Sequence, residues 1–466
     1  MPLLLAIALL LSTAPVFAQT EASAGEAALD FDFYRARIEP LFLVKRPGNV
    51  RCVECHERGA GALRFQSLVN GAWSPEASRK NLAALSVFVV PGSVKASRLL
   101  QHPLDRESGG DPFHGGGKHW TAADAEYRTL AAWVNGARLR PGAGGAALQR
   151  VVRILQTNAA GDNTHVIDPA TNTVVAVIND IRIPHGVTSM PDGSLVFISD
   201  EALHTLDVVD ARSLSVIARV PLSGRPNNVT ISRDGRKVYV GIREAPGALD
   251  VIETSSLTRV KTIPVAGEVH NVYVTPDGKF AVAGSIPAST ISIVDTSTDQ
   301  MVRTIKMSAG IRPMAFDKKP DGSTNRIFVQ LSNFHGFAAV DFDSGKELAR
   351  IEHPAIPGVH PHRDGLQSAP AHGLEVSPDG KQLWSTSKVY GYAYVHSLPD
   401  LKEIGRVFVG QHPEWLTFTP DGRRAYVAAA GDNQTFVVDT TTLKEVARIP
   451  VGQVPKRIGT AVLQTF

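Results

Sequence analysis

Short apolar runs separated by polar turns repeat along the longer, C-terminal part of the chain. Asp-Gly turns follow one another at intervals of 42, 43, 44, 58 and 42 residues, at Asp192-Gly193, Asp234-Gly235, Asp277-Gly278, Asp321-Gly322, Asp379-Gly380 and Asp421-Gly422. Each unit contains four short strand-like runs. A period of about 40 residues with four strands is typical of one blade of a β-propeller. The pattern therefore predicts an all-β propeller over residues 150–466.

The ends of this segment predict how the propeller closes. Six turns give six innermost strands, and residues 456–466 supply a seventh with no strands after it. Residues 151–178 contain three strands with no innermost strand before them. Pairing the two ends makes one composite blade and a seven-bladed ring, which leaves no unpaired strand edge.

The N-terminal part has helical periodicity instead. Residues 31–42 carry apolar side chains at helical spacing, and residues 124–136 form a second such run that ends at a glycine. Together they predict a small all-α domain over residues 31–137. The Gly- and Pro-rich residues 138–149 are predicted to link it to the propeller.

The first residues predict export. Residues 1–18 combine an apolar run with small residues where a signal peptidase cuts, so we expect a signal peptide, a periplasmic location and a tether over residues 19–30. No stretch reaches the roughly 20 apolar residues of a membrane span. The 466 residues carry a net charge of only +3 with no block of Lys or Arg, which argues against a nucleic-acid partner.

One short motif carries specific chemistry: Cys52-Val53-Glu54-Cys55-His56. Two thiols at this spacing can add to the vinyl groups of haem, and the adjacent imidazole can bind the iron. A thioredoxin-like pair or half a zinc site are the alternatives. The chain has no further cysteine and no βαβ pattern nearby, so we expect one covalent haem c and no disulfide.

The order of helix, CxxCH motif, loops and aromatic closing helix makes residues 31–137 resemble c-type cytochromes. The resemblance implies that Cys52 and Cys55 hold the haem and that His56 is the proximal ligand.

The distal ligand departs from the commonest form of that family. The methionines are Met1, Met190, Met301, Met307 and Met314, so none lies in the cytochrome-like segment. The candidates are His102, His114 and His119. His114 is favoured because the following Gly115-Gly116-Gly117 lets backbone approach a flat ring. Residues 114–136 also resemble the HGGG…Y-R-x-L…W-x-x-G pattern of cytochrome-like domains fused to large exported bacterial proteins. Two histidine ligands would lower the reduction potential relative to Met/His ligation.

The propeller segment has its own resemblance. The run Tyr273-Val274-Thr275-Pro276-Asp277-Gly278 is similar to the repeat of YVTN-type propellers, and through them to the redox propellers of nitrous oxide reductase and of the d-type-haem nitrite reductases. The order of cytochrome and propeller is that of the nitrite reductases, although those propellers have eight blades.

Histidines recur in register in the repeats. The position seven residues before each turn Asp holds His185, Asn227, His270, Met314, His372 and Glu414, and Lys456 takes the corresponding place in the composite blade. Such residues line one mouth of a propeller channel. His185, His270 and His372 are therefore predicted catalytic residues. The long repeat contains an insertion with His360 and His362, which could roof the mouth beside His412.

A ring of imidazoles suits a transition metal such as copper, or a second haem. It could equally supply acid and base groups over a substrate anion, with Arg363 and Lys456 adding charge. Capping of blade turns is the structural alternative for any single histidine. His165, His204, His335, His353 and His396 lie off the register and are predicted at the surface or in loops, and Trp384 and Trp415 are predicted in blade cores.

The function predicted from the sequence is an exported haem c oxidoreductase that passes electrons between a soluble redox partner protein and the histidine-lined site. The alternatives are a non-catalytic electron carrier whose propeller is a docking platform, and a hydrolase of the lactonase type, for which the haem would have no task.

Overall fold

A computed structural model describes residues 29–44, 50–59, 61–69, 72–112, 114–137 and 149–465. The chain divides into two compact units, Met1–Gly145 and Ala146–Phe466. The predicted signal peptide, most of the tether and nearly all of the predicted linker lie outside the described residues. None of the helices in the described part combines the length and apolarity that a bilayer crossing requires.

The N-terminal unit is helical in the described ranges. Its elements are α1 (Phe31–Phe33), the π-helical turn η1 (Tyr34–Ile38), the 3₁₀ turn η2 (Glu39–Phe42), α2 (Cys52–Glu57), α3 (Pro75–Ser86), α4 (Arg98–Gln101) and α5 (Ala125–Val134). The helical segments predicted over residues 31–42 and 124–136 are confirmed. The first is continuous but changes its helical type twice.

An aromatic cluster joins the two ends of this unit. Tyr34 of η1 and Trp133 of α5 are both fully buried, with ring centroids 5.9 Å apart. The Trp133 indole N–H donates to the carbonyl of Asp30, 3.1 Å away. Burial of these large rings supplies much of the driving force for packing so small a unit.

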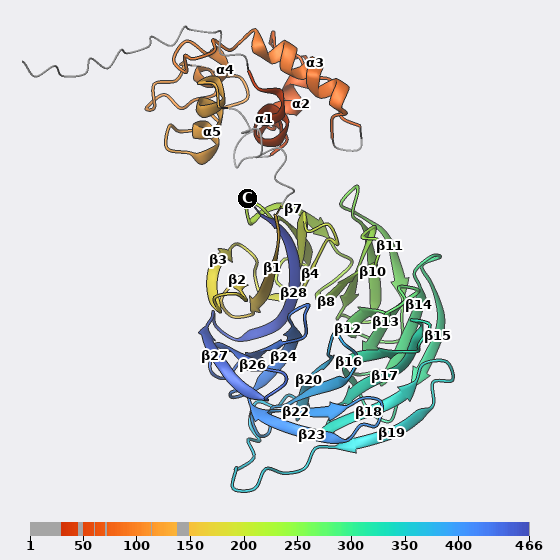
Figure 1. The fold of residues 1–466 in the computed structure, drawn as a ribbon. Helices are drawn as coiled ribbons and strands as arrows, with labels where there is room; N and C mark the ends of the chain where they lie inside the picture. The colour runs from red at the N-terminus through yellow and green to blue at the C-terminus, as the bar shows by residue number, and fades with distance from the viewer. Residues whose placement is uncertain are drawn as a thin grey trace, which may run out of the picture. The chain divides into compact units, whose positions relative to one another are not determined.

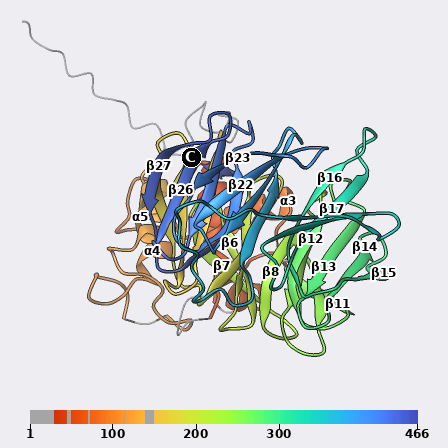
Figure 2. The same ribbon diagram turned by 90° about the horizontal axis from the view of Figure 1, so that it is seen from below.

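The C-terminal unit is a seven-bladed β-propeller, as predicted. Seven four-stranded antiparallel sheets have the strand orders β28-β1-β2-β3, β4-β5-β6-β7, β8-β9-β10-β11, β12-β13-β14-β15, β16-β17-β18-β19, β20-β21-β22-β23 and β24-β25-β26-β27. Their first strands neighbour one another around a ring, which Figure 1 shows face-on. Figure 2, turned by 90°, shows β8, β12 and β13 running side by side.

The strand bounds are β1 (Gln149–Asn158), β2 (Asn163–Asp168), β3 (Thr173–Ile178), β4 (Pro184–Ser189), β5 (Leu195–Asp200), β6 (Thr205–Asp210), β7 (Ser215–Pro221), β8 (Pro226–Ile231), β9 (Lys237–Ile242), β10 (Ala248–Glu253), β11 (Thr258–Pro264), β12 (Val269–Val274), β13 (Phe280–Ser285), β14 (Thr290–Asp295), β15 (Gln300–Lys306), β16 (Ile311–Lys318), β17 (Thr324–Leu331), β18 (Gly336–Asp341), β19 (Glu347–Glu352), β20 (Ala371–Val376), β21 (Gln382–Ser387), β22 (Tyr392–Ser397), β23 (Glu403–Phe408), β24 (Pro413–Phe418), β25 (Arg424–Ala429), β26 (Gln434–Asp439), β27 (Lys444–Pro450) and β28 (Pro455–Thr465).

Burial within a blade follows the position of the strand. Middle strands such as β5 and β9 are buried along nearly their whole length, because neighbouring sheets cover both of their faces. Outer strands such as β3 and β7 alternate between exposed and less exposed residues, since only one face packs on the core. The apolar clusters span adjacent sheets and join the blades.

The two ends of the propeller pair directly. β28 is antiparallel to β1 from Gln149↔Thr465 to Asn158↔Pro455, so the last strand of the chain is the innermost strand of the first sheet. The ring therefore has backbone hydrogen bonds where the chain would otherwise leave an open edge.

Two histidines outside the register are buried, contrary to the prediction for them. His353 is 3% and His396 1% exposed, and the His353 ring stacks on Tyr394 with centroids 4.3 Å apart. Its Nε2 lies 2.7 Å from the hydroxyl of Ser385. The sequence pattern missed these residues because a neutral imidazole packs like an aromatic ring when its nitrogen has a partner. His204 is exposed, as predicted.

Closure through β28 can be tested by a core truncation. Leu463 is 1% exposed and packs in a cluster with Leu155 and Val187. Leu463→Ala is expected to lower the free energy of unfolding by about 2–5 kcal/mol, through lost burial and a cavity. Leu348→Ala on β19, at a residue 56% exposed, is the matched control and should cost less than about 1 kcal/mol. Equal losses in urea unfolding would contradict the packing of β28.

His396 predicts a sensitivity to acid. Burial and then the charge of Arg406 lower the pKa of His396 to about 4. Below a pH of about 6.5, the pKa of histidine in the unfolded chain, the unfolded state binds a proton at His396 that the folded state does not bind. The free energy of unfolding therefore decreases as the pH decreases. His396→Gln is expected to flatten the fall in melting temperature between about pH 6.5 and 4, whereas His204→Gln, at an exposed histidine, leaves it unchanged. An identical slope in His396→Gln and the unaltered protein would refute the assignment.

Candidate functional site

The N-terminal unit gathers its thiols and imidazoles around one cavity. α2 begins at Cys52, and residues three and four apart share one face of a helix, so Cys52, Cys55 and His56 point to the same side. Arg51 at the helix start pairs with Glu54, 2.7 Å away. The His56 Nδ1–H donates to the carbonyl of Leu63 at 3.2 Å, so Nε2 is the ring nitrogen that could bind a metal.

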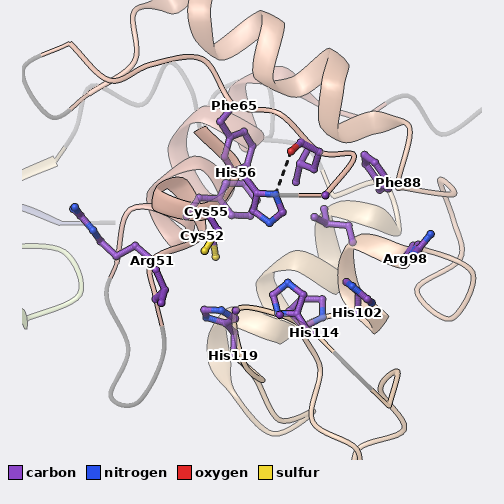
Figure 3. A pocket seen from close by; sticks show the side chains of 18 of the residues that line it. Arg51, Cys52, Cys55, His56, Phe65, Phe88, Arg98, His102, His114 and His119 are labelled. Atoms are coloured by element: carbon purple, nitrogen blue, oxygen red, sulfur yellow. Dashed lines mark hydrogen bonds between the residues drawn. The ribbon is translucent and has the colours of Figure 1, made fainter. Parts of the chain in front are cut away.

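The cavity has a volume of about 470 Å³, within the range of small-ligand pockets. Its walls are largely apolar and include Phe42, Phe65, Phe88, Leu99 and Trp120. Figure 3 shows His56 and the two sulfurs on one side and His102, His114 and His119 on the other. The structure therefore brings together all of the predicted haem-binding residues and all three candidate distal ligands.

His114 has the same arrangement as His56. Its Nδ1–H donates to the carbonyl of Gly117 at 2.6 Å, because a carbonyl can only accept, and Nε2 is left with its lone pair. Burial, then the neighbouring His102 and His56, lower its pKa and keep the ring neutral. A side chain at Gly115 would meet nothing within 4 Å, so the backbone there borders open cavity.

His102 differs from His114 in its ring partner. The His102 Nδ1 lies 2.9 Å from Asp111 Oδ2, and both side chains are half-exposed. A neutral imidazole whose Nδ1 is fixed by a carbonyl is the usual form of a metal-binding histidine, which favours His114 over His102. His119 is 6% exposed, and its backbone N–H donates to the carbonyl of Pro103 at 2.8 Å.

The propeller unit contains a second cavity of about 450 Å³ at one mouth of its channel. The second residues of the innermost strands are His185, Asn227, His270, Arg312, His372, Glu414 and Lys456, and all of them except Asn227 and Glu414 line the cavity. His185, His270 and His372 all line the cavity, and so does Lys456. The predicted register is correct in six of these seven strands. Arg312 stands in place of Met314, because β16 and β17 are eight residues long and their register is irregular.

Hydroxyl groups of the preceding blade fix several of these residues. The Thr157 hydroxyl donates to the carbonyl of His185 at 3.1 Å, and the Ser199 hydroxyl donates to the carbonyl of Asn227 at 2.6 Å. Thr386 makes the same bond to Glu414 at 3.0 Å. The lining positions are thereby held by buried bonds that cross from one sheet to its neighbour.

A second set of lining residues was missed by the sequence reasoning. Glu201, Arg243, Ile286 and Lys388 each follow directly after the second strand of a blade, and all of them line the cavity. The position after the second strand recurs in every repeat, as the position seven residues before the turn does, and could have been found in the same way.

The three histidines surround Trp415 rather than a common point. Ring centroids lie 5.3 Å (His185), 6.4 Å (His270) and 4.3 Å (His372) from the Trp415 ring. Trp415 packs in an apolar cluster, as predicted, and also forms a wall of the cavity. Within the described ranges no three His, Cys, Asp or Glu side chains are arranged to hold a metal ion.

A buried charge network supports one side of the cavity. Glu414 lies 2.8 Å from Lys388 and 2.8 Å from the Nδ1 of His372. His372 and Lys388 hold the pKa of Glu414 well below its usual range, despite its burial. Burial lowers the pKa of His372 to about 4, so the ring is neutral at pH 7. With its Nδ1 facing the carboxylate, His372 keeps Nε2 available to accept a proton.

His360, His362 and His412, which were predicted near the mouth, are not among the residues that line the cavity. His360 and His362 are exposed on the insertion, as is Arg363, and His412 packs near His362 with ring centroids 6.1 Å apart. The insertion reaches the mouth through a different residue. The turn closed by Leu366 and Ala369 presents Gln367, which lines the cavity and whose carbonyl accepts a hydrogen bond from Arg312.

Comparison with known proteins identifies the fold. No protein-family model matches the sequence, and a comparison with curated proteins gives no match. The propeller is a known fold. Solved structures similar to it include hydrazine synthase of Kuenenia stuttgartiensis, with a TM-score of 0.54, 20% identity and coverage of 62% of this chain and 92% of that one.

Two further structures represent different chemistry. The periplasmic gluconolactonase of Pseudomonas aeruginosa has a TM-score of 0.53 and 19% identity, and the match covers 66% of this chain and 99% of that one. A dihydro-haem d1 dehydrogenase has a TM-score of 0.50 and 17% identity, covering 79% of this chain and 91% of that one. At these identities the similarity establishes the shared fold and leaves the chemistry to the site.

Proposed function

We propose that this chain is an exported, periplasmic haem c redox protein whose N-terminal unit is a cytochrome c-like domain. Cys52 and Cys55 would hold one haem through thioethers, His56 would bind the iron from one side and His114 from the other. The haem would supply one-electron transfer to or from a soluble partner protein. The observation that carries the proposal is the cavity that presents two thiols and His56 opposite His114.

The residues of this cavity fit the cofactor. The apolar walls suit a macrocycle, and the two sulfurs come from the same helix face as the imidazole that would bind the iron. Both His56 and His114 donate Nδ1–H to backbone carbonyls, and such a bond orients the imidazole of a metal-binding histidine. Gly115 leaves open space where a side chain would fill the cavity.

The propeller would provide the site at which the electrons are used. Buried, neutral histidines and several cations lining one cavity favour a reacting site over a surface used only for docking. The similarity to the propellers of hydrazine synthase and of the dihydro-haem d1 dehydrogenase is compatible with an oxidoreductase. A non-catalytic carrier is the alternative, and it leaves these buried charges without a task.

Covalent attachment can be tested with graded cysteine variants made alongside haem-attachment machinery. Cys52→Ser combined with Cys55→Ser is expected to abolish haem that survives denaturing electrophoresis, because no thioether can form. Each single variant should keep one thioether and shift the pyridine haemochrome band. Haem that stays bound to the double variant under denaturing conditions would refute covalent attachment through this motif.

The distal ligand can be tested by spectroscopy. His114→Ala is expected to convert a low-spin, six-coordinate absorption spectrum into a five-coordinate, high-spin one, because the second imidazole is lost. His102→Ala and His119→Ala are the matched controls from the same wall of the cavity and should keep the low-spin spectrum. A low-spin spectrum in His114→Ala together with a changed spectrum in either control would move the assignment to that residue.

A further inference from the structure

The propeller cavity contains more positive charge than its histidines account for. Four cationic side chains line it: Arg243, Arg312, Lys388 and Lys456. We infer that this cavity binds a small organic dianion, whose two anionic groups are held apart by cations on opposite sides of the ring.

The order of the sheets separates the cations into two groups. Arg243 and Arg312 come from the sheets on either side of the one that bears His270, whereas Lys388 and Lys456 come from the sheets on either side of the one that bears Glu414. The sheets of His270 and Glu414 are three sheets apart, the largest separation in a ring of seven, so the two groups are centred on opposite sides of the channel, although Arg312 and Lys388 come from neighbouring sheets. One anionic group would contact the arginines and the other the lysines.

The acidic residues of the site do not cancel this charge. Glu414 is the ion-pair partner of Lys388, and the carboxylate of Glu201 lies 4.0 Å from the Nε2 of His185. Two carboxylates against four cations leave two positive charges in excess when the histidines are neutral. Arg243 and Lys456 form no direct ion pair with any described residue, and the single carboxylate of Glu201 is the charge on which both of them act, so the pair keeps one positive charge in excess for a ligand.

Burial makes the site selective for a bound anion. Arg312 is 7% and Lys388 2% exposed, and burial lowers the pKa of Arg312 to about 10, which still keeps it charged at neutral pH. Its Nε donates to Ser332 at 3.1 Å and its outer nitrogen to the Gln367 carbonyl, so the guanidinium is held in place. Fixed charges in a poorly hydrated cavity attract a counter-charge more strongly than surface charges do.

The apolar part of the cavity wall and the cavity volume favour an organic ligand over a purely inorganic one. Trp415, Ile183 and Ile286 line the cavity, and its volume of about 450 Å³ exceeds what one compact oxyanion fills. A carbon skeleton between the two anionic groups would pack on the Trp415 ring. The Nε2 of His372 would then face the skeleton as a neutral proton acceptor.

This inference deepens the proposed function, on which it rests for naming the cavity as the reacting site. Binding itself does not require haem. The two can therefore fail separately: the absorption spectrum reports on the haem, and calorimetry on the same sample reports on the anion.

The test is isothermal titration of the full-length holoprotein at low salt. The probes are succinate for two carboxylates, sulfoacetate for a sulfonate with a carboxylate, acetate for one charge and sulfate for a compact dianion. At least one organic dianion is expected to bind ten-fold or more tightly than acetate and sulfate. Which of the two binds better distinguishes a dicarboxylate from a ligand with one tetrahedral oxyanion group.

Variants locate the binding. Arg243→Gln and Lys456→Gln are each expected to weaken binding by about ten-fold or more, as the loss of a charged hydrogen bond predicts, and Arg243→Lys should restore part of the loss. Arg236→Gln removes the same charge from the opposite end of the blade of Arg243, where Arg236 contacts Asp234, and should leave binding unchanged. Acetate or sulfate binding as tightly as both organic dianions, no binding of either dianion, or unchanged binding in Arg243→Gln and Lys456→Gln would overturn the inference.

Discussion

The pairing of β1 with β28 is the constraint on which the propeller site depends. The lining residues occupy equivalent positions in seven sheets, and they converge on one cavity only because the sheets form a closed ring. Hydroxyl groups such as those of Thr157 and Ser199 then tie the backbone of a lining residue to the preceding blade. Closure and local hydrogen bonding together hold like charges near one another, an arrangement that an open sheet would relax by splaying.

The N-terminal unit positions its thiols and imidazoles with only a few short helices. Cys52, Cys55 and His56 lie on one helix face. A backbone carbonyl fixes the orientation of the His56 ring, and another fixes that of the His114 ring. The opposite wall combines the short helix α4 and its C-cap His102 with the loop that carries His114 and His119. The aromatic core centred on Tyr34 and Trp133 holds the first and last helical segments of this unit together, and so supports the cavity walls between them.

Local sequence patterns were sufficient to predict the propeller fold and many of the residues of both cavities. The turn period gave seven blades, and counting back from each turn found His185, His270 and His372, because β-strands translate sequence spacing directly into position. The count failed at Arg312, where longer strands shift the register, and at Arg243 and Lys388, which follow strands whose ends a turn-based count does not mark. His353 and His396 show the same limit, since burial depends on neighbours distant in sequence.

The lining of the propeller cavity has a consequence for how such a protein diversifies. Most lining residues lie on the first strand of a blade, as His185 and His270 do, or directly follow its second strand, as Glu201 and Arg243 do, and each blade has its own hydrogen-bonded sheet. A change at one lining position can therefore alter the charge or shape of the cavity while the other six sheets stay where they are. The ligand specificity of the cavity can therefore change through substitutions in one blade at a time.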